Sequence, residues 1–159
     1  MPHKVSTCLW FDTQAEEAAN FYVSLIPGSK VTAITRYDKG APLPEGTALT
    51  VVFQLAGTEY LGLNGGPIFP QSEAVSIVVQ CDAQDEIDHL WSALTVDGGK
   101  ESRCGWLKDR YGVSWQIVPA RIGDWMTGTD KAAAGRAFGA IMQMAKIDIA
   151  IVEKAFRGE

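Results

Sequence analysis

The sequence predicts an α+β protein of two tandem βαβββ modules followed by a C-terminal helical tail. Three observations lead to this fold class. Short runs rich in β-branched and aromatic residues alternate with two amphipathic helices. The pattern of the first helix returns about 69 residues further along the chain, and the last 40 residues carry apolar positions at helical spacing. We therefore expect paired modules in residues 1–119, at about 1–66 and 73–119, and a helical extension in residues 120–159.

The first module opens with a strand and a helix. Residues 5–11 are rich in β-branched and aromatic side chains, and residues 13–26 place their apolar side chains on one helical stripe. Thr13 and Glu16 have the spacing of a capping box, and Pro27-Gly28 is a typical helix stop. Three further strands are expected at residues 31–37, 49–55 and 59–63.

The second module repeats this order. Residues 75–81 are expected to form a strand, and Asp82 introduces a helix in which Leu90-Trp91 corresponds to Phe21-Tyr22 of the first helix. A chance match of two helices is the alternative to a true repeat. Strands are then expected in "ESRCGWLKD" and "VSWQIVP", joined by a tight turn at Tyr111-Gly112.

The region after Pro119 is predicted to be helical. Its apolar positions are Ile141, Met142, Ala145, Ile149, Val152 and Phe156. This stripe predicts either packing on the outside of the sheets or contact with a second subunit.

Composition restricts the class of protein. A net charge of -5 with no basic cluster argues against nucleic acid as a partner. No apolar run approaches the roughly 20 residues of a membrane span, and the opening "MPHKVSTC" has no apolar export segment. The three cysteines form no CxxC pair, which favours buried free thiols in a reducing compartment. We therefore expect a cytoplasmic protein without a membrane partner.

Three motifs resemble a known family. "LWFDTQAEEAANFYVSLIPGSKV", "CGWLKDRYGVSWQIVP" and "KIDIA" are similar to the PhnB-like branch of the vicinal oxygen chelate superfamily, which includes glyoxalases, bleomycin resistance proteins and extradiol dioxygenases. "DRYG" lies where this superfamily has a D-P-x-G turn before its final strand. The resemblance implies two modules that form a half-open barrel around a cavity, usually in a homodimer.

The PhnB-like branch often carries the label 3-demethylubiquinone-9 3-methyltransferase, which the residues do not support. A methyl donor bound on a doubly wound sheet needs a glycine-rich turn between a strand and a helix. The only glycine cluster after a strand is "LGLNGG", and Pro67 and Pro70 follow where that helix should begin. We expect no methyltransferase site.

The resemblance also implies four positions for metal ligands, which fall at Ser6, Gly62, Val75 and Gln116. Only Gln116 has a ligating side chain, and one amide is a poor site for a divalent cation. A register error of one residue would exchange the two faces of a strand, but the neighbouring residues supply no ligand set either. These neighbours are Val5, Thr7, Leu61, Leu63, Ala74 and Ser76. We therefore expect no metal and no other cofactor, with Gln116 at the position of a lost ligand.

Strand periodicity identifies the side chains that would line the cavity. If Gln116 faces the cavity, Ser114 and Val118 face it too, while Trp115 faces the helices. The predicted ligand-binding residues are Ser6, Cys8, Trp10, Cys104, Trp106, Lys108, Ser114 and Gln116. The alternative for Trp10 and Trp106 is that they simply fill the barrel.

The sequence thus predicts a homodimeric protein that binds a small, largely apolar or aromatic molecule without a tightly bound metal. Two alternatives stay open. One is a glyoxalase- or isomerase-like lyase that recruits a divalent metal through Gln116, and the other is a structural or interaction protein with a collapsed cavity.

Overall fold

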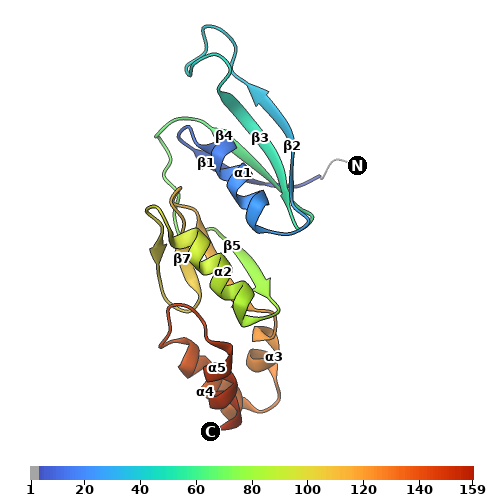
Figure 1. The fold of residues 1–159 in the computed structure, drawn as a ribbon, viewed down its shortest axis with the longest axis vertical. Helices are drawn as coiled ribbons and strands as arrows, with labels where there is room; N and C mark the ends of the chain where they lie inside the picture. Colours follow the sequence, from blue (N-terminus) through green and yellow to red (C-terminus); the bar gives the residue numbers. More distant parts are fainter. Residues whose placement is uncertain (1–3) are drawn as a thin grey trace. The chain divides into compact units, whose positions relative to one another are not determined.

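A computed structural model describes residues 4–159, which form two compact units, the first ending at Gln71 and the second running from Ser72 to Glu159 (Figure 1). Residues 1–3, the start of the predicted first module, lie outside the described residues. Each unit contains one four-stranded mixed sheet and a helix that packs on it, and three short helices follow the second sheet. The predicted α+β class, with two βαβββ modules and a helical tail, is confirmed. Each sheet is open and does not close into a barrel.

The first unit has its strands in the order β1-β4-β3-β2. Strand β1 runs parallel to β4, and the other neighbours are antiparallel. Register shifts between Val31 and Ala33 and between Thr35 and Arg36 interrupt the ladder of β2. Helix α1 buries Tyr22 against Phe53 of β3, with ring centroids 6.2 Å apart. The elements are β1 (Thr7–Phe11), α1 (Ala15–Leu25), β2 (Lys30–Arg36), β3 (Ala48–Leu55) and β4 (Thr58–Asn64).

The start of α1 is capped from a distant strand, so the predicted capping box of Thr13 and Glu16 is wrong. The buried side chain of Asn64, at the end of β4, accepts a hydrogen bond from Ala15 N at 2.8 Å. Its amide donates to the carbonyl of Ala48 in β3 at 2.9 Å. Glu16 instead binds Arg36 with both carboxylate oxygens, at 2.8 Å each. Asn64 therefore joins α1, β3 and β4 through one side chain.

The second unit has the strand order β5-β8-β7-β6, with β5 parallel to β8. The predicted correspondence of the two helices is confirmed, because Trp91 of α2 is buried as Tyr22 of α1 is. Strands form in "ESRCGWLKD" as predicted, but Cys104, expected on the strand with Trp106 and Lys108, lies before that strand begins. Positive φ angles at Cys104 (59°) and Gly105 (82°) turn the backbone between two shorter strands. The elements are β5 (Ser76–Cys81), α2 (Gln84–Thr95), β6 (Lys100–Glu101), β7 (Trp106–Lys108) and β8 (Ser114–Pro119).

The turn between β7 and β8 is organised by a buried carboxylate. Asp109 Oδ1 accepts hydrogen bonds from Tyr111 N (2.8 Å) and Val113 N (3.0 Å), and Oδ2 accepts one from Trp115 Nε1 (2.9 Å). Gly112 closes the turn with φ 82°. Asp109 thus fixes both the start of β8 and the orientation of the Trp115 indole on that strand.

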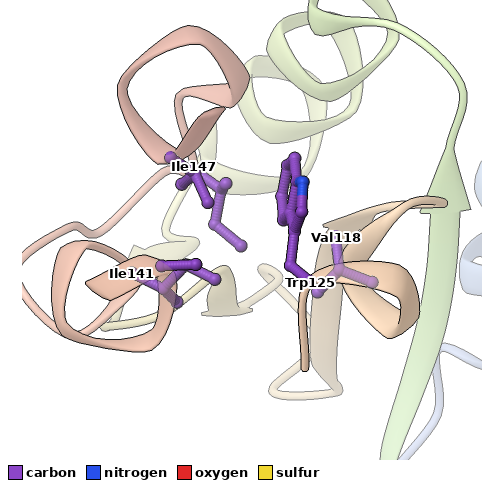
Figure 2. Close-up of a cluster of buried hydrophobic side chains, with 6 residues drawn as sticks. Val118, Trp125, Ile141 and Ile147 are labelled. Carbon is purple, nitrogen blue, oxygen red and sulfur yellow. The ribbon is translucent and has the colours of Figure 1, made fainter. Parts of the chain in front are cut away.

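The tail forms three short helices. Residues 142–148 link the last two helices without being helical, so the single apolar helical stripe expected from Ile141 to Phe156 is wrong. Figure 2 shows Val118 of β8 and three tail residues, Trp125, Ile141 and Ile147, converging on one buried cluster. Gln84 of α2 also binds the link, donating to Ile147 O (3.1 Å) and accepting from Ile149 N (2.9 Å). The tail therefore packs on its own second module. The helices are α3 (Ile122–Thr127), α4 (Lys131–Ile141) and α5 (Ile149–Arg157).

No helix within residues 4–159 has the length and apolar character needed to cross a bilayer. The three cysteines are free thiols, but the expected burial holds for Cys81 alone, since Cys8 is exposed and Cys104 is half-buried.

We predict that Asn64→Ala destabilises the protein by about 2 to 4 kcal/mol, because it leaves the buried amide of Ala15 and the carbonyl of Ala48 without their partner. Urea unfolding followed by circular dichroism measures this change. Asn20→Ala is the matched control: its exposed amide bonds only Glu16 O within α1, and we expect a change within about 0.5 kcal/mol. Equal effects of the two substitutions would contradict the capping role of Asn64.

Candidate functional site

The second sheet has one face packed on α2 and an opposite face that carries mainly polar side chains. Leu107, Trp115 and Ile117 are fully buried and alternate with Trp106, Lys108, Ser114 and Gln116. On β6, the carboxylate of Glu101 accepts a hydrogen bond from Trp91 Nε1 of α2 at 2.6 Å, so the preceding Lys100 lies on the other side. We call this other side the open face, formed by Lys100, Trp106, Lys108, Ser114, Gln116, Ser76 and Val78.

Strand register arranges the open face in two rows. Lys100, Lys108, Ser114 and Ser76 are successive cross-strand partners from β6 to β5. In the next row, Trp106 of β7 pairs with Gln116, which pairs with Val78. Cationic, hydroxyl, amide and aromatic groups therefore lie within the reach of one small molecule.

Polar contacts on the open face leave the buried hydroxyl of Ser114 without a partner among residues 4–159. Gln116 Nε2 donates to Ser76 Oγ at 2.9 Å, and Lys108 Nζ lies 2.6 Å from Glu73 Oε1. The hydrogen bond from Lys108 lowers the pKa of Glu73 below its usual value, and a backbone hydrogen bond adds to this effect. Ser114 is 1% exposed, and its Oγ has no hydrogen-bond partner among the described residues.

A pocket with a volume of about 270 Å³ lies at this unsatisfied hydroxyl. Its lining consists of Trp106, Leu107, Lys108 and Ser114, together with Lys100 and Glu101 of β6, Ser102 just after it, and Glu73 in the segment before β5. The site thus combines an aromatic ring with a buried hydroxyl, two lysines and two carboxylates. Both carboxylates already have partners, since Glu73 pairs with Lys108 and Glu101 accepts from Trp91 Nε1.

Four of the predicted ligand-binding residues share the open face, namely Trp106, Lys108, Ser114 and Gln116. Cys104 does not join them, and its predicted place on one strand face with Trp106 and Lys108 is wrong. It lies in the β6–β7 turn, with its Sγ 3.4 Å from Met142 Sδ, and packs toward the tail core. Val118 was expected on the same strand face as Ser114 and Gln116. In the structure its side chain is covered by the buried cluster of the tail.

The other three predicted residues belong to the first unit. Ser6 precedes β1 and is exposed, as is Cys8, while Trp10 is half-buried. The Trp10 indole donates to Gly66 O at 2.9 Å and meets Phe69 edge-on, with ring centroids 4.9 Å apart. Trp10 therefore packs locally against the loop after β4.

Two of the thiols, those of Cys8 and Cys81, are not activated as nucleophiles, because burial raises the pKa of each. Burial, with the nearby carboxylates of Glu86 and Asp82, raises the pKa of Cys81 to about 12, which keeps it protonated.

In the described part of the chain, the four positions implied for metal ligands do not supply a ligand set for a divalent metal. Within residues 4–159, no three His, Cys, Asp or Glu side chains gather in an arrangement that could hold an ion. Gly62 faces α1, where an added Cβ would lie 3.2 Å from Ala15 Cβ, and Val75 precedes β5. The partner of Gln116 on the open face is Ser76, a neutral hydroxyl.

Sequence reasoning missed Lys100 and Glu73. Lys100 lies just before the strand that was expected to begin at Glu101, so a slightly earlier boundary would have placed it opposite Lys108. Glu73 lies in the segment between the modules, where no periodicity indicates the direction of a side chain.

A family model described as 3-demethylubiquinone-9 3-methyltransferase matches residues 3–118. The chain belongs to this family. Its solved relatives include the PhnB protein from Bacillus cereus that carries the same methyltransferase name, at 36% identity and TM-score 0.69, covering 74% of this chain and all of that one. The fold is that of the vicinal oxygen chelate superfamily, which the resemblance predicted.

More distant structures share the fold alone. A protein from Pseudomonas aeruginosa has 20% identity and TM-score 0.60, covering 74% of this chain and 97% of that one. The fosfomycin resistance protein FosX from Listeria monocytogenes, solved with Mn(II) and sulfate, has 14% identity and TM-score 0.51, covering 74% and 91%. No curated protein matches the chain.

Proposed function

We propose that this protein binds a small molecule on the open face of its second sheet. The supporting observation is Ser114, whose hydroxyl is buried beside a pocket and has no hydrogen-bond partner within residues 4–159. An unsatisfied buried hydroxyl costs about 1 to 3 kcal/mol, and this cost ends when a ligand supplies the missing partner. Such a group is tolerated more readily at a binding site than in a closed core.

The pocket suits a compact ligand with an apolar part. Its volume of about 270 Å³ lies near the lower end of the usual range for small-molecule sites. Trp106 offers a ring face for stacking, next to the side chain of Gln116. The proposed ligand is therefore small and carries both a ring or alkyl group and a polar group.

Methyl transfer is not part of this proposal, although the family carries that name. Strand β4 leads through Gly65-Gly66 into a loop with Pro67 and Pro70, and the next regular element is β5. This strand–loop–strand order lacks the helix N-terminus that binds a nucleotide-like methyl donor on a doubly wound sheet.

We predict that indole binds the protein and that Trp106→Ala weakens this binding roughly tenfold, since a stacking surface is lost. Saturation-transfer NMR titrations provide the measurement. Phe21→Ala, which truncates a partly exposed ring on α1 of the first unit, is the control and should leave the affinity unchanged. Equal losses in the two variants, or no binding to the unmodified protein, would argue against the proposed site.

We further propose that binding requires no tightly held divalent metal, because Ser76, Ser114 and Gln116 supply only neutral donors. Elemental analysis after dialysis is expected to find well below one zinc, nickel, iron or manganese ion per chain. About one ion per chain, lost in Gln116→Ala, would instead support the metal-dependent lyase.

A homodimer through the tail is the proposed assembly. Phe138, 54% exposed, and Met142 lie one turn apart at the end of α4, and Ile151 of α5 is also exposed, which gives the tail an apolar surface. We predict a dimer in light scattering at micromolar concentration and its loss in Phe138→Glu. Ile68→Glu places the same charge on an exposed apolar residue of the first unit and should leave the dimer intact. A monomeric unmodified protein would refute this assembly.

A further inference from the structure

Two lysines face the same pocket from neighbouring strands. Lys100 of β6 and Lys108 of β7 are antiparallel partners, so their side chains leave the same face of the sheet. Like charges directly opposite each other are destabilising in such a pair. An anion between them would remove this repulsion.

The row of cross-strand partners that begins with Lys100 and Lys108 continues at Ser114. Lys108 is the cross-strand partner of Ser114, whose unpartnered hydroxyl is buried. A hydroxyl proton and an ammonium group side by side are the donors that bind a carboxylate or phosphonate oxygen. Trp106, on the adjacent row, provides an apolar surface for the rest of such a molecule.

Glu73 is the anion that Lys108 binds in the free protein. Its carboxylate lies 2.6 Å from Lys108 Nζ, but its side chain is 68% exposed, and it leaves Ser114 Oγ without a partner. Exposed ion pairs of this kind contribute little to stability. A ligand oxyanion that reaches both Lys108 and Ser114 would therefore replace Glu73 at small cost.

From this arrangement we propose that the site takes a small organic oxyanion, a carboxylate or phosphonate attached to an apolar group, and that Glu73 competes with it for Lys108. This inference rests on the proposed small-molecule site and specifies the class of ligand. The oxyanion accepts hydrogen bonds from Lys108 Nζ and Ser114 Oγ, Lys100 adds its charge, and the apolar group lies on Trp106.

Titration calorimetry and amide NMR with three probes test the inference: benzoate, phenylphosphonate and the neutral benzyl alcohol. Both anions are expected to bind roughly tenfold or more tightly than benzyl alcohol, and the preferred anion identifies a planar or a tetrahedral head group. Lys108→Gln should abolish this preference while benzyl alcohol binds as before, and Lys108→Arg should retain much of it. Lys146→Gln removes the same charge from an exposed pair with Asp88 and is the control, expected to change nothing.

Glu73 and Ser114 have opposite expected effects on anion affinity. Glu73→Gln removes the competing carboxylate and should tighten binding of both anions several-fold. Ser114→Ala should weaken that binding several-fold without lowering the urea midpoint, because the hydroxyl has no partner to lose in the free protein. Weaker binding in Glu73→Gln would overturn the competition.

The outcomes separate the two levels of the proposal. If all three probes bind with similar affinity and shift the amides around Trp106 and Ser114, the oxyanion class is refuted and the small-molecule site stands. If none of them shifts these amides, both the ligand class and the proposed site are refuted.

Discussion

The second unit depends on the buried carboxylate of Asp109. Its three hydrogen bonds hold the β7–β8 turn and fix the indole of Trp115 on the helix side of the sheet. Because side chains alternate along a strand, this anchor also sets Ser114 and Gln116 on the opposite side. A carboxylate removed from water needs such complete bonding, so the polar face of the sheet is positioned by an interaction on the other face. In the first unit Asn64 has a similar role, since one buried polar side chain joins a helix to two strands.

Much of the architecture was predictable because it follows from local periodicity. The equivalence of Tyr22 and Trp91 identified the repeat, and alternation along β8 put Ser114 and Gln116 on the face opposite Trp115. The errors came where distant contacts decide the local structure. The cap of α1 is supplied by Asn64, which lies 49 residues after Ala15. The left-handed backbone at Cys104 is accompanied by hydrogen bonds from Cys104 N and Gly105 N to the carbonyls of Met144 and Ala145.

The tail lies outside the part of the chain that the family model matches, which ends at residue 118. Even so, it is integrated into the second unit. An added Cβ at Gly105 would lie 2.9 Å from Ile147 Cδ1, so the glycine lets the β6–β7 turn approach the tail closely. The tail therefore supports the turn that leads into β7, the strand that carries Trp106 and Lys108.

The interrupted ladder of β2 has a consequence for solubility. An edge strand of seven residues presents unpaired backbone groups that another chain could extend into a larger sheet. Here the two register shifts disturb the regular spacing of those groups, and Lys30 places a positive charge at one end of the strand. The opposite case is β6, which with two residues is too short to act as a template. The outer strand of each antiparallel hairpin is thus protected from strand addition by a different means.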